Sequence, residues 1–230
     1  MVQSPMAAQG IYPDSDGQPM AENTLQYRWI VRLVSNLRRL LNDQTAFVAG
    51  DLLWYPVPVR VPPAPAQAPD AMVVLGRPDS ERGSYKQWEE ENIAPQVVFE
   101  ILSPSNSARE MLTKQAFYSQ YGVLEMYFYD PETFDFWGLI RPSSDQDFAP
   151  IMAMNVPWVS PLLGIRFEIF DTGLEVFYPN GDRFQDPEVV IVEREQLQQE
   201  RDRAQQERDR AQEERDRAFA KLRELGIDPP

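Results

Sequence analysis

Residues 97–123 read VVFEILSPSNSAREMLTKQAFYSQYGV, and the interpretation of the whole chain starts from this stretch. Its first six residues are apolar except for Glu100, which predicts a short strand covered on both faces. Ser107 with Glu110 three residues later matches a capping box, so a helix is expected to begin there. Gly122 suits the left-handed position that ends a helix. We therefore expect a buried strand followed by a helix of about four turns.

Glu100 is the residue of this stretch that most needs an explanation. An ionised carboxylate inside a buried strand is unfavourable unless it is paired or bound to a cation. Alternatively the strand is half-exposed and Glu100 faces solvent, as expected for Glu168 within IRFEIF at 165–170, where charged and apolar residues alternate. Val98 and Leu102 share the face of Glu100 and leave both interpretations open.

Lys114 is the second candidate, because the chain has three lysines against nineteen arginines. Met111, Lys114 and Tyr118 share one stripe of the expected helix. A lysine in such a stripe often only extends past the rings to solvent. However, the strand rises roughly 10 Å from Glu100 to the turn. The helix descends roughly 10 Å from its cap to Lys114, so a helix that folds back brings Lys114 level with Glu100.

Asp70 opens a compact apolar segment, residues 70–75, directly after a proline. Pro-Asp often begins a strand for turn reasons alone, so the interest of Asp70 lies in its pairing with Glu100 on a second buried strand. Two carboxylates and a lysine are a minimal set for Mg²⁺-assisted hydrolysis of a phosphodiester. The carboxylates, with the Ile101 carbonyl as a further ligand, would hold the metal, and the lysine would stabilise developing charge. Asp51 is either a third acid of this site or a turn residue.

The composition of the 230 residues narrows the chemistry further. The chain has no cysteine and no histidine, which excludes disulfides, thiol catalysis, Ser-His-Asp triads and histidine-bound zinc. Catalysis must therefore use carboxylates, lysine, tyrosine, hydroxyls or a metal held by oxygen ligands. No apolar run approaches ~20 residues and no signal-peptide pattern is present, so we expect a soluble, cytoplasmic protein without a membrane partner.

The remaining sequence predicts three parts: an irregular N-terminal arm (1–24), one globular domain (25–185) and a helical tail (186–230). Within the domain, the expected elements are a helix at 25–41 capped by Asn23 or Thr24, one strand or two short strands at 46–55, a proline-rich loop at 56–69, strands at 123–129 and 134–140, and further antiparallel strands in 149–180.

The tail repeats QERDRAQ every seven residues, and a long solvated helix is expected at 193–224. One column of this repeat is apolar (Leu197, Ala204, Ala211, Ala218 and Leu225), whereas the next is Arg201, Arg208, Arg215 and Leu222. A strong two-stranded coiled coil needs both columns apolar, so weak self-association at best is expected. Three i,i+4 ion pairs should support the helix: Arg203–Glu207, Arg210–Glu214 and Glu213–Arg217. The stretch 193–224 carries a charge of −1, which leaves −13 of the total −14 on the rest of the chain.

The order of several short motifs resembles the Uma-two family of restriction-endonuclease-like proteins, within the PD-(D/E)XK superfamily. These motifs are Pro69-Asp70, VFEILSPS at 98–105, Lys114 with Tyr118, Gly122-Val123, EMY at 125–127 and Asp130-Pro131. The resemblance covers roughly residues 25–175. It implies an α/β, restriction-endonuclease-like fold with a central mixed β-sheet flanked by helices, to which this chain adds its long charged C-terminal helix.

The resemblance also implies a metal-dependent endonuclease that hydrolyses DNA, with Asp70 and Glu100 as ligands of Mg²⁺ or Mn²⁺. The superfamily lysine usually lies two residues after the acid, where this chain has Leu102, so its role would pass to Lys114. A homodimer is common in the superfamily. The alternative is a catalytically inactive, nuclease-like interaction protein whose C-terminal helix mediates assembly or partner binding. The charge of −13 favours this alternative, because proteins that bind DNA neutralise phosphates with Lys and Arg.

Overall fold

The computed structural model describes residues 11–15, 17 and 19–224. The chain divides into two compact units, Met1–Gln185 and Asp186–Pro230. Much of the expected N-terminal arm lies outside the described residues, and its described part up to residue 23 contains no helix or strand. Among the helices that are described, none is both long and apolar enough to cross a membrane.

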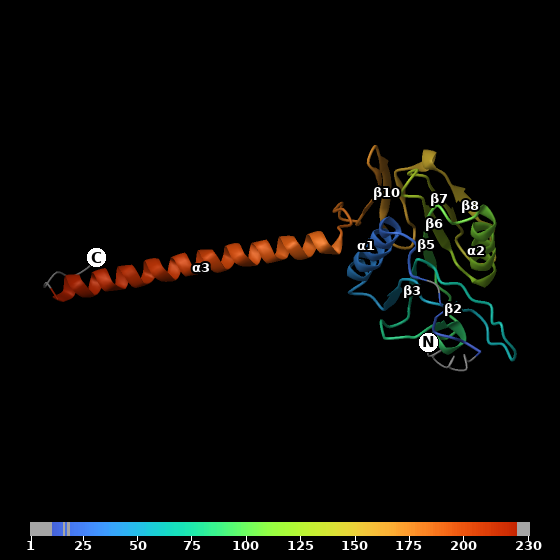
Figure 1. Cartoon of the computed structure of the whole chain (residues 1–230), viewed down its shortest axis with the longest axis horizontal. Helices are drawn as coiled ribbons and strands as arrows, with labels where there is room; N and C mark the ends of the chain where they lie inside the picture. The colour runs from blue at the N-terminus through green and yellow to red at the C-terminus, as the bar shows by residue number, and fades with distance from the viewer. Residues whose placement is uncertain (1–10, 16, 18, 225–230) are drawn as a thin grey trace, which may run out of the picture. The chain divides into compact units, whose positions relative to one another are not determined.

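A six-stranded mixed sheet forms the centre of the first unit (Figure 1). Only β5 and β6 pair in parallel, and the helix between them provides the crossover that a parallel pair needs. All other neighbours in this sheet are antiparallel. The strands, in spatial order, are β1 (Ala46–Ala49), β3 (Ala71–Leu75), β5 (Val97–Ile101), β6 (Glu125–Tyr129), β7 (Phe136–Ile140) and β8 (Ala149–Ile151). The expected central mixed sheet is confirmed.

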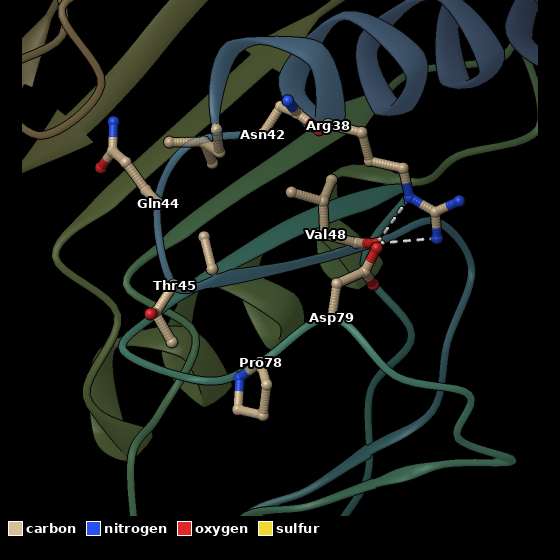
Figure 2. A pocket seen from close by; sticks show the side chains of 9 residues that line it. Arg38, Asn42, Gln44, Thr45, Val48, Pro78 and Asp79 are labelled. Atoms are coloured by element: carbon tan, nitrogen blue, oxygen red, sulfur yellow. Dashed lines mark hydrogen bonds between the residues drawn. The ribbon is translucent and has the colours of Figure 1, made fainter.

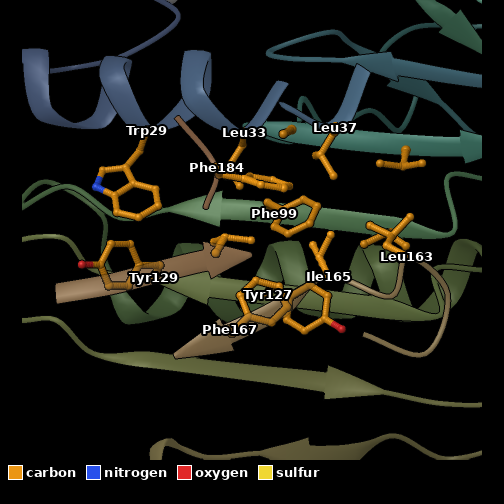
Figure 3. Close-up of a cluster of buried hydrophobic side chains, with 14 of the residues drawn as sticks. Trp29, Leu33, Leu37, Phe99, Tyr127, Tyr129, Leu163, Ile165, Phe167 and Phe184 are labelled. Atoms are coloured by element: carbon orange, nitrogen blue, oxygen red, sulfur yellow. The ribbon is translucent and has the colours of Figure 1, made fainter. Parts of the chain in front are cut away.

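Helix α1 (Thr24–Leu40) covers one face of this sheet, and Asn23 caps it by accepting a hydrogen bond from the backbone N–H of Gln26. Figure 3 shows its apolar stripe lying over aromatic side chains of β5 and β6. Leu25, in the first turn of the helix, is 38 % exposed. A second sheet completes this layer: β9 (Trp158–Val159), β10 (Arg166–Phe170) and β11 (Gly173–Phe177).

Helix α2 (Ala108–Tyr121) covers the opposite face and buries Met111 and Tyr118. Ser107 caps it by accepting from the N–H of Glu110 at 3.2 Å. The Glu110 carboxylate accepts instead from Asn106 at 3.2 Å. Two short parallel strands and a 3₁₀ turn complete this face: β2 (Trp54–Tyr55), β4 (Tyr85–Lys86) and η1 (Gln87–Glu89). Strand β4 was not predicted, because the sequence around it is polar and shows no strand pattern.

Several predicted boundaries change. The segment 46–55 forms two strands, β1 and β2, in two different sheets. Strand β7 begins at Phe136 rather than residue 134, because Phe134 has a positive φ of 64° inside the preceding turn. A short 3₁₀ helix, η2 (Ala153–Asn155), interrupts the antiparallel strands of 149–180. Glu168 is half-buried and forms an ion pair with Arg166 instead of simply facing solvent.

The second unit contains one helix, α3 (Pro187–Glu224), which begins six residues before the expected start at residue 193. Of the three expected i,i+4 ion pairs, Glu213–Arg217 is present at 3.3 Å, and the other two are not formed. Glutamine-to-aspartate hydrogen bonds recur at heptad spacing in their place: Gln198–Asp202, Gln205–Asp209 and Gln212–Asp216. Leu225 of the predicted apolar column lies outside the described residues.

Gly122 ends α2 with φ of 104°, as the sequence predicts. A Cβ at this position would lie 3.1 Å from the Cβ of Ala94. We expect Gly122→Ala to lower the free energy of unfolding by about 1–2 kcal/mol, and by more than Gly181→Ala, because a left-handed backbone is unfavourable for residues with a Cβ and the new Cβ would crowd Ala94. Urea denaturation measures this loss. Gly181→Ala is the control, since Gly181 has a similar φ of 91° and open space around it. An equal loss in both variants would show that the contact with Ala94 contributes nothing.

Candidate active site

Strand pairing places the two predicted carboxylates side by side on one face of the sheet. The β3–β5 register pairs Met72 with Val98 and Ala71 with Phe99. One further step places Asp70 opposite Glu100, and residues directly opposite in an antiparallel pair point to the same face. Both side chains are buried, with 8 % of Asp70 and 2 % of Glu100 exposed.

Helix α2 supplies the partners of Glu100. The Lys114 ammonium donates to Oε2 of Glu100 at 2.7 Å, and the Tyr118 hydroxyl donates to Oε1. Lys114 and Tyr118 lie one helical turn apart, so both reach the same carboxylate. Glu100 is thus a buried, paired carboxylate, and the solvent-facing interpretation is wrong.

Both backbone groups of Ile101, at the end of β5, are satisfied by side chains. The residue opposite Ile101 in the β3–β5 register is Pro69, which has no N–H to donate to the Ile101 carbonyl. The Pro69 carbonyl accepts from the N–H of Asp51 at 3.0 Å, and the backbone N–H of Ile101 donates to Oδ2 of Asp70 at 2.6 Å. The carbonyl of Ile101 accepts from the side chain of Gln26 on α1 at 2.8 Å. The expectation that this carbonyl is a further metal ligand stays a prediction, because Gln26 uses only one of the two lone pairs of the oxygen.

Asp70 and Lys114 open into a cavity of about 410 Å³. Its lining is strongly acidic, with Glu22, Asp51 and Glu110 beside these two residues. Asp51 combines both interpretations offered for it, since it has a turn-type φ of 49° and also lines the cavity. Arginine is absent from the described lining. The cavity therefore favours a cation over an anion.

Burial and charge shift the ionisation of these groups. Burial, together with the neighbouring charge of Glu100, raises the pKa of Asp70 to about 8. Burial also raises the pKa of Glu100, although Lys114 and Tyr118 oppose this shift. Burial acts to lower the pKa of Lys114, but the carboxylates of Glu100 and Asp70 outweigh it and hold the pKa above its ordinary value. Lys114 is consequently a fixed positive charge and not a proton acceptor at neutral pH.

The donor set fits an oxygen-ligated divalent cation. Two buried carboxyl groups face one lysine, so ionisation of both leaves an uncompensated negative charge that a cation would neutralise. Carboxylate oxygens coordinate Mg²⁺ and Mn²⁺ well. Both ions keep several bound waters, so they need few protein ligands. Within the described residues, no three Asp or Glu side chains come together in a metal-binding cluster. Asp70 and Glu100 therefore suit a site in which water supplies most of the ligands.

Another hollow, of about 350 Å³, lies beside the end of α1 (Figure 2). Arg38 reaches over it and donates two hydrogen bonds to the carbonyl of Val48, at 3.2 and 3.0 Å. Val48 belongs to β1, an edge strand of the main sheet, so Arg38 covers a carbonyl that a further strand would otherwise pair with. Asp79 is the acidic residue of its described lining. This hollow lacks the paired groups that catalysis requires.

The sequence did not predict the contacts that two residues, Tyr118 and Gln26, make at the candidate site. Tyr118 was recognised only as part of a helical stripe, although its position four residues after Lys114 is the signal that could have linked it to Glu100. Gln26 gave no signal, because its role follows from a gap in the ladder some 75 residues away along the chain. Both side chains hold the site in place: Tyr118 orients Glu100, and Gln26 fixes the end of β5.

The raised pKa of Asp70 predicts a pH-dependent stability. Between the ordinary carboxyl pKa near 4 and the folded value of about 8, the folded protein holds a proton that the unfolded chain has lost. Stability should therefore fall as pH rises through this window, by up to about 1.4 kcal/mol per pH unit. Asp70→Asn should flatten this dependence, because an amide does not titrate and still accepts from Ile101. Urea denaturation in EDTA at several pH values measures it, and parallel curves for the two proteins would contradict the shift.

The chain is similar to one known protein family and to a solved structure. No curated protein matches the chain. A solved structure from Anabaena variabilis, described as a "putative nuclease belonging to DUF820", is 16 % identical to it. The match has a TM-score of 0.47 and covers 65 % of this chain and 81 % of that one. Residues 12–146, more than half of the chain, match the family described as "Putative restriction endonuclease", and the chain therefore belongs to the Uma2 family.

Proposed function

We propose that this protein is a metal-dependent endonuclease that hydrolyses phosphodiester bonds of DNA at the cavity lined by Asp70 and Lys114. The observation that carries the proposal is the convergence of three ionisable groups from distant parts of the chain. Glu100 lies 2.7 Å from Lys114, and Asp70 lies opposite Glu100 in the sheet register. Membership of the Uma2 family supports the same reaction class.

Each residue has a distinct part in the proposed reaction. Asp70 and Glu100 would hold one Mg²⁺ or Mn²⁺ ion, which supplies Lewis acidity toward the phosphate and lowers the pKa of bound water. Lys114 stays protonated and stabilises negative charge that develops on the phosphate. Tyr118 fixes the orientation of the Glu100 carboxylate. Asp70 is fixed in the same way by its bond from Ile101.

The acidic character of the protein sets the conditions for this activity. A body with a charge of −13 repels DNA at long range, and the cavity adds three further acids to the proposed ligands. A bound divalent ion would offset this charge locally. The same observations favour the alternative of a nuclease-like interaction protein without cleavage activity, which the two experiments below distinguish from the nuclease.

Removal of the Glu100 charge should weaken metal binding. We expect Glu100→Gln to weaken Mn²⁺ affinity by more than about tenfold, since even partners that only support a ligand contribute 10–100-fold. Isothermal titration calorimetry of the full chain measures this. Glu125→Gln is a matched control, because Glu125 is equally buried but lies on the opposite face of the sheet, where Ser160 and Leu162 donate to it. Equal affinities in the wild type and in Glu100→Gln would refute the proposed ligand.

Lys114→Met should separate binding from catalysis. Methionine keeps the apolar stem but removes the charge, so we expect Mn²⁺ binding to persist and cleavage of plasmid DNA to fall by about 10²-fold or more. Lys86→Met is the control, because Lys86 lies on β4 outside the cavity lining. If the wild type binds Mn²⁺ and cleaves no DNA over a range of salt concentrations, the interaction-protein alternative holds. Cleavage that survives in Lys114→Met would remove Lys114 from the mechanism.

A further inference from the structure

Helix α3 carries three regular columns of side chains that repeat every seven residues. One column is apolar and consists of Val190, Leu197, Ala204, Ala211 and Ala218. The column three residues further on is acidic, and it consists of Glu193, Glu200, Glu207 and Glu214. The column four residues further on is basic, and it consists of Arg194, Arg201, Arg208 and Arg215. Residues three and four apart lie on the same side of a helix, so the three columns form one continuous face.

Several polar side chains elsewhere on the helix pair with one another. Glutamine-to-aspartate bonds recur once per heptad, as at Gln205–Asp209 with 2.8 Å, and Glu213 pairs with Arg217. Within the described part of α3, by contrast, the glutamate column makes no ion pair or hydrogen bond through its side chains. The same holds for Arg194, Arg201 and Arg208. Apart from Arg215, which pairs with Asp216 at 3.7 Å, the charges of these two columns are therefore available to a partner outside the described helix.

The apolar column itself is open to solvent. Leu197 is 66 % exposed, and Ala204, Ala211 and Ala218 are exposed as well. A helix with one stripe of apolar residues and two stripes of opposite charge is complementary to a copy of itself. We propose that two copies of this chain associate through α3, with the two helices antiparallel.

Helix direction follows from the arginine column. With the apolar column at heptad position d, the arginine column falls at position a. A parallel pair would place each arginine opposite the same arginine of the second copy and stack four layers of like charge. In an antiparallel pair, each position a faces a position d. Every arginine then lies against an apolar residue, for the most part an alanine that leaves room for the long side chain.

The length of the helix selects one register. If residue 204 lies opposite residue 208 of the second copy, then 201 lies opposite 211 and 194 opposite 218. This register aligns residue 190 with residue 222, so the two helices overlap over almost the whole of Pro187–Glu224. A shift by one heptad in either direction would remove layers from an end. Each copy contributes four glutamates and four arginines of these columns, so their formal charges sum to zero. The two glutamate columns share one edge of the antiparallel pair, and the arginines of the seam must offset their repulsion.

Mass measurement with seam variants tests the association, which is independent of the proposed nuclease activity. We expect the full chain to approach twice 26.5 kDa in sedimentation equilibrium as its concentration rises. The double variant Ala204→Glu/Ala211→Glu should raise the dissociation constant by about tenfold or more, because it introduces charge into the seam. The control Gln199→Glu/Gln206→Glu adds the same charge on the far side of the helix. A monomeric wild type up to about 1 mM chain overturns the proposal, as do equal effects of both double variants.

Cysteine cross-linking tests the direction, because the natural chain has no cysteine. We expect a mixture of Arg194→Cys and Ala218→Cys chains to form a mixed disulfide under mild oxidation. Neither variant should cross-link to itself, since the two copies of either position would lie about 36 Å apart along the pair. Disulfides formed by each variant alone would show a parallel pair and overturn the antiparallel arrangement. The absence of any cross-link in the mixture would overturn the register.

Discussion

The two backbone hydrogen bonds of Ile101 hold the candidate site together. Because Pro69 has no N–H, the carbonyl of Ile101 loses its ladder donor and accepts from Gln26 of α1 instead. The Pro69 carbonyl accepts from Asp51, and the N–H of Ile101 donates to the Asp70 carboxylate. These two bonds of Ile101 fix Asp70 on the face of Glu100 and tie the first turn of α1 to the end of β5. One residue thereby connects three separate segments.

The second constraint is the charge of Glu100. A buried ion pair rarely adds net stability, because desolvation offsets the attraction. The Glu100–Lys114 pair is accordingly better understood as the arrangement that makes a buried carboxylate possible than as a source of stability. Glu125 shows the structural alternative within the same sheet, since it is equally buried yet satisfied by neutral donors. The charged partner of Glu100, Lys114, lines the cavity that Asp70 also lines, and that connection supports a functional role for Glu100.

The sequence predicted those features that depend on local geometry. Strand β5, the cap of α2 and its end at Gly122 follow from patterns within a few residues. The meeting of Glu100 with Lys114 follows from rise per residue in adjacent elements. Features that depend on distant segments were missed: Gln26 acts on a carbonyl that Pro69 leaves free, and β4 pairs with β2 through a polar sequence without periodicity. The start of α3 was placed too late, because its apolar first turn, from Val189 to Val192, does not carry the heptad charge pattern used to recognise the helix.

The distribution of charge connects the candidate site with its proposed ligand. The cavity offers one lysine to several carboxyl groups, so a phosphate alone meets net repulsion there, whereas a divalent ion meets attraction. With the ion in place, Lys114 and the metal together present positive charge to a phosphate, and repulsion from the rest of the acidic body is screened over roughly 8 Å at physiological salt. In the proposed reaction, the cation would therefore be a condition for substrate binding as well as for chemistry. An acidic nuclease of this design would engage DNA only in its metal-bound form, which distinguishes it from proteins that bind DNA through a basic surface.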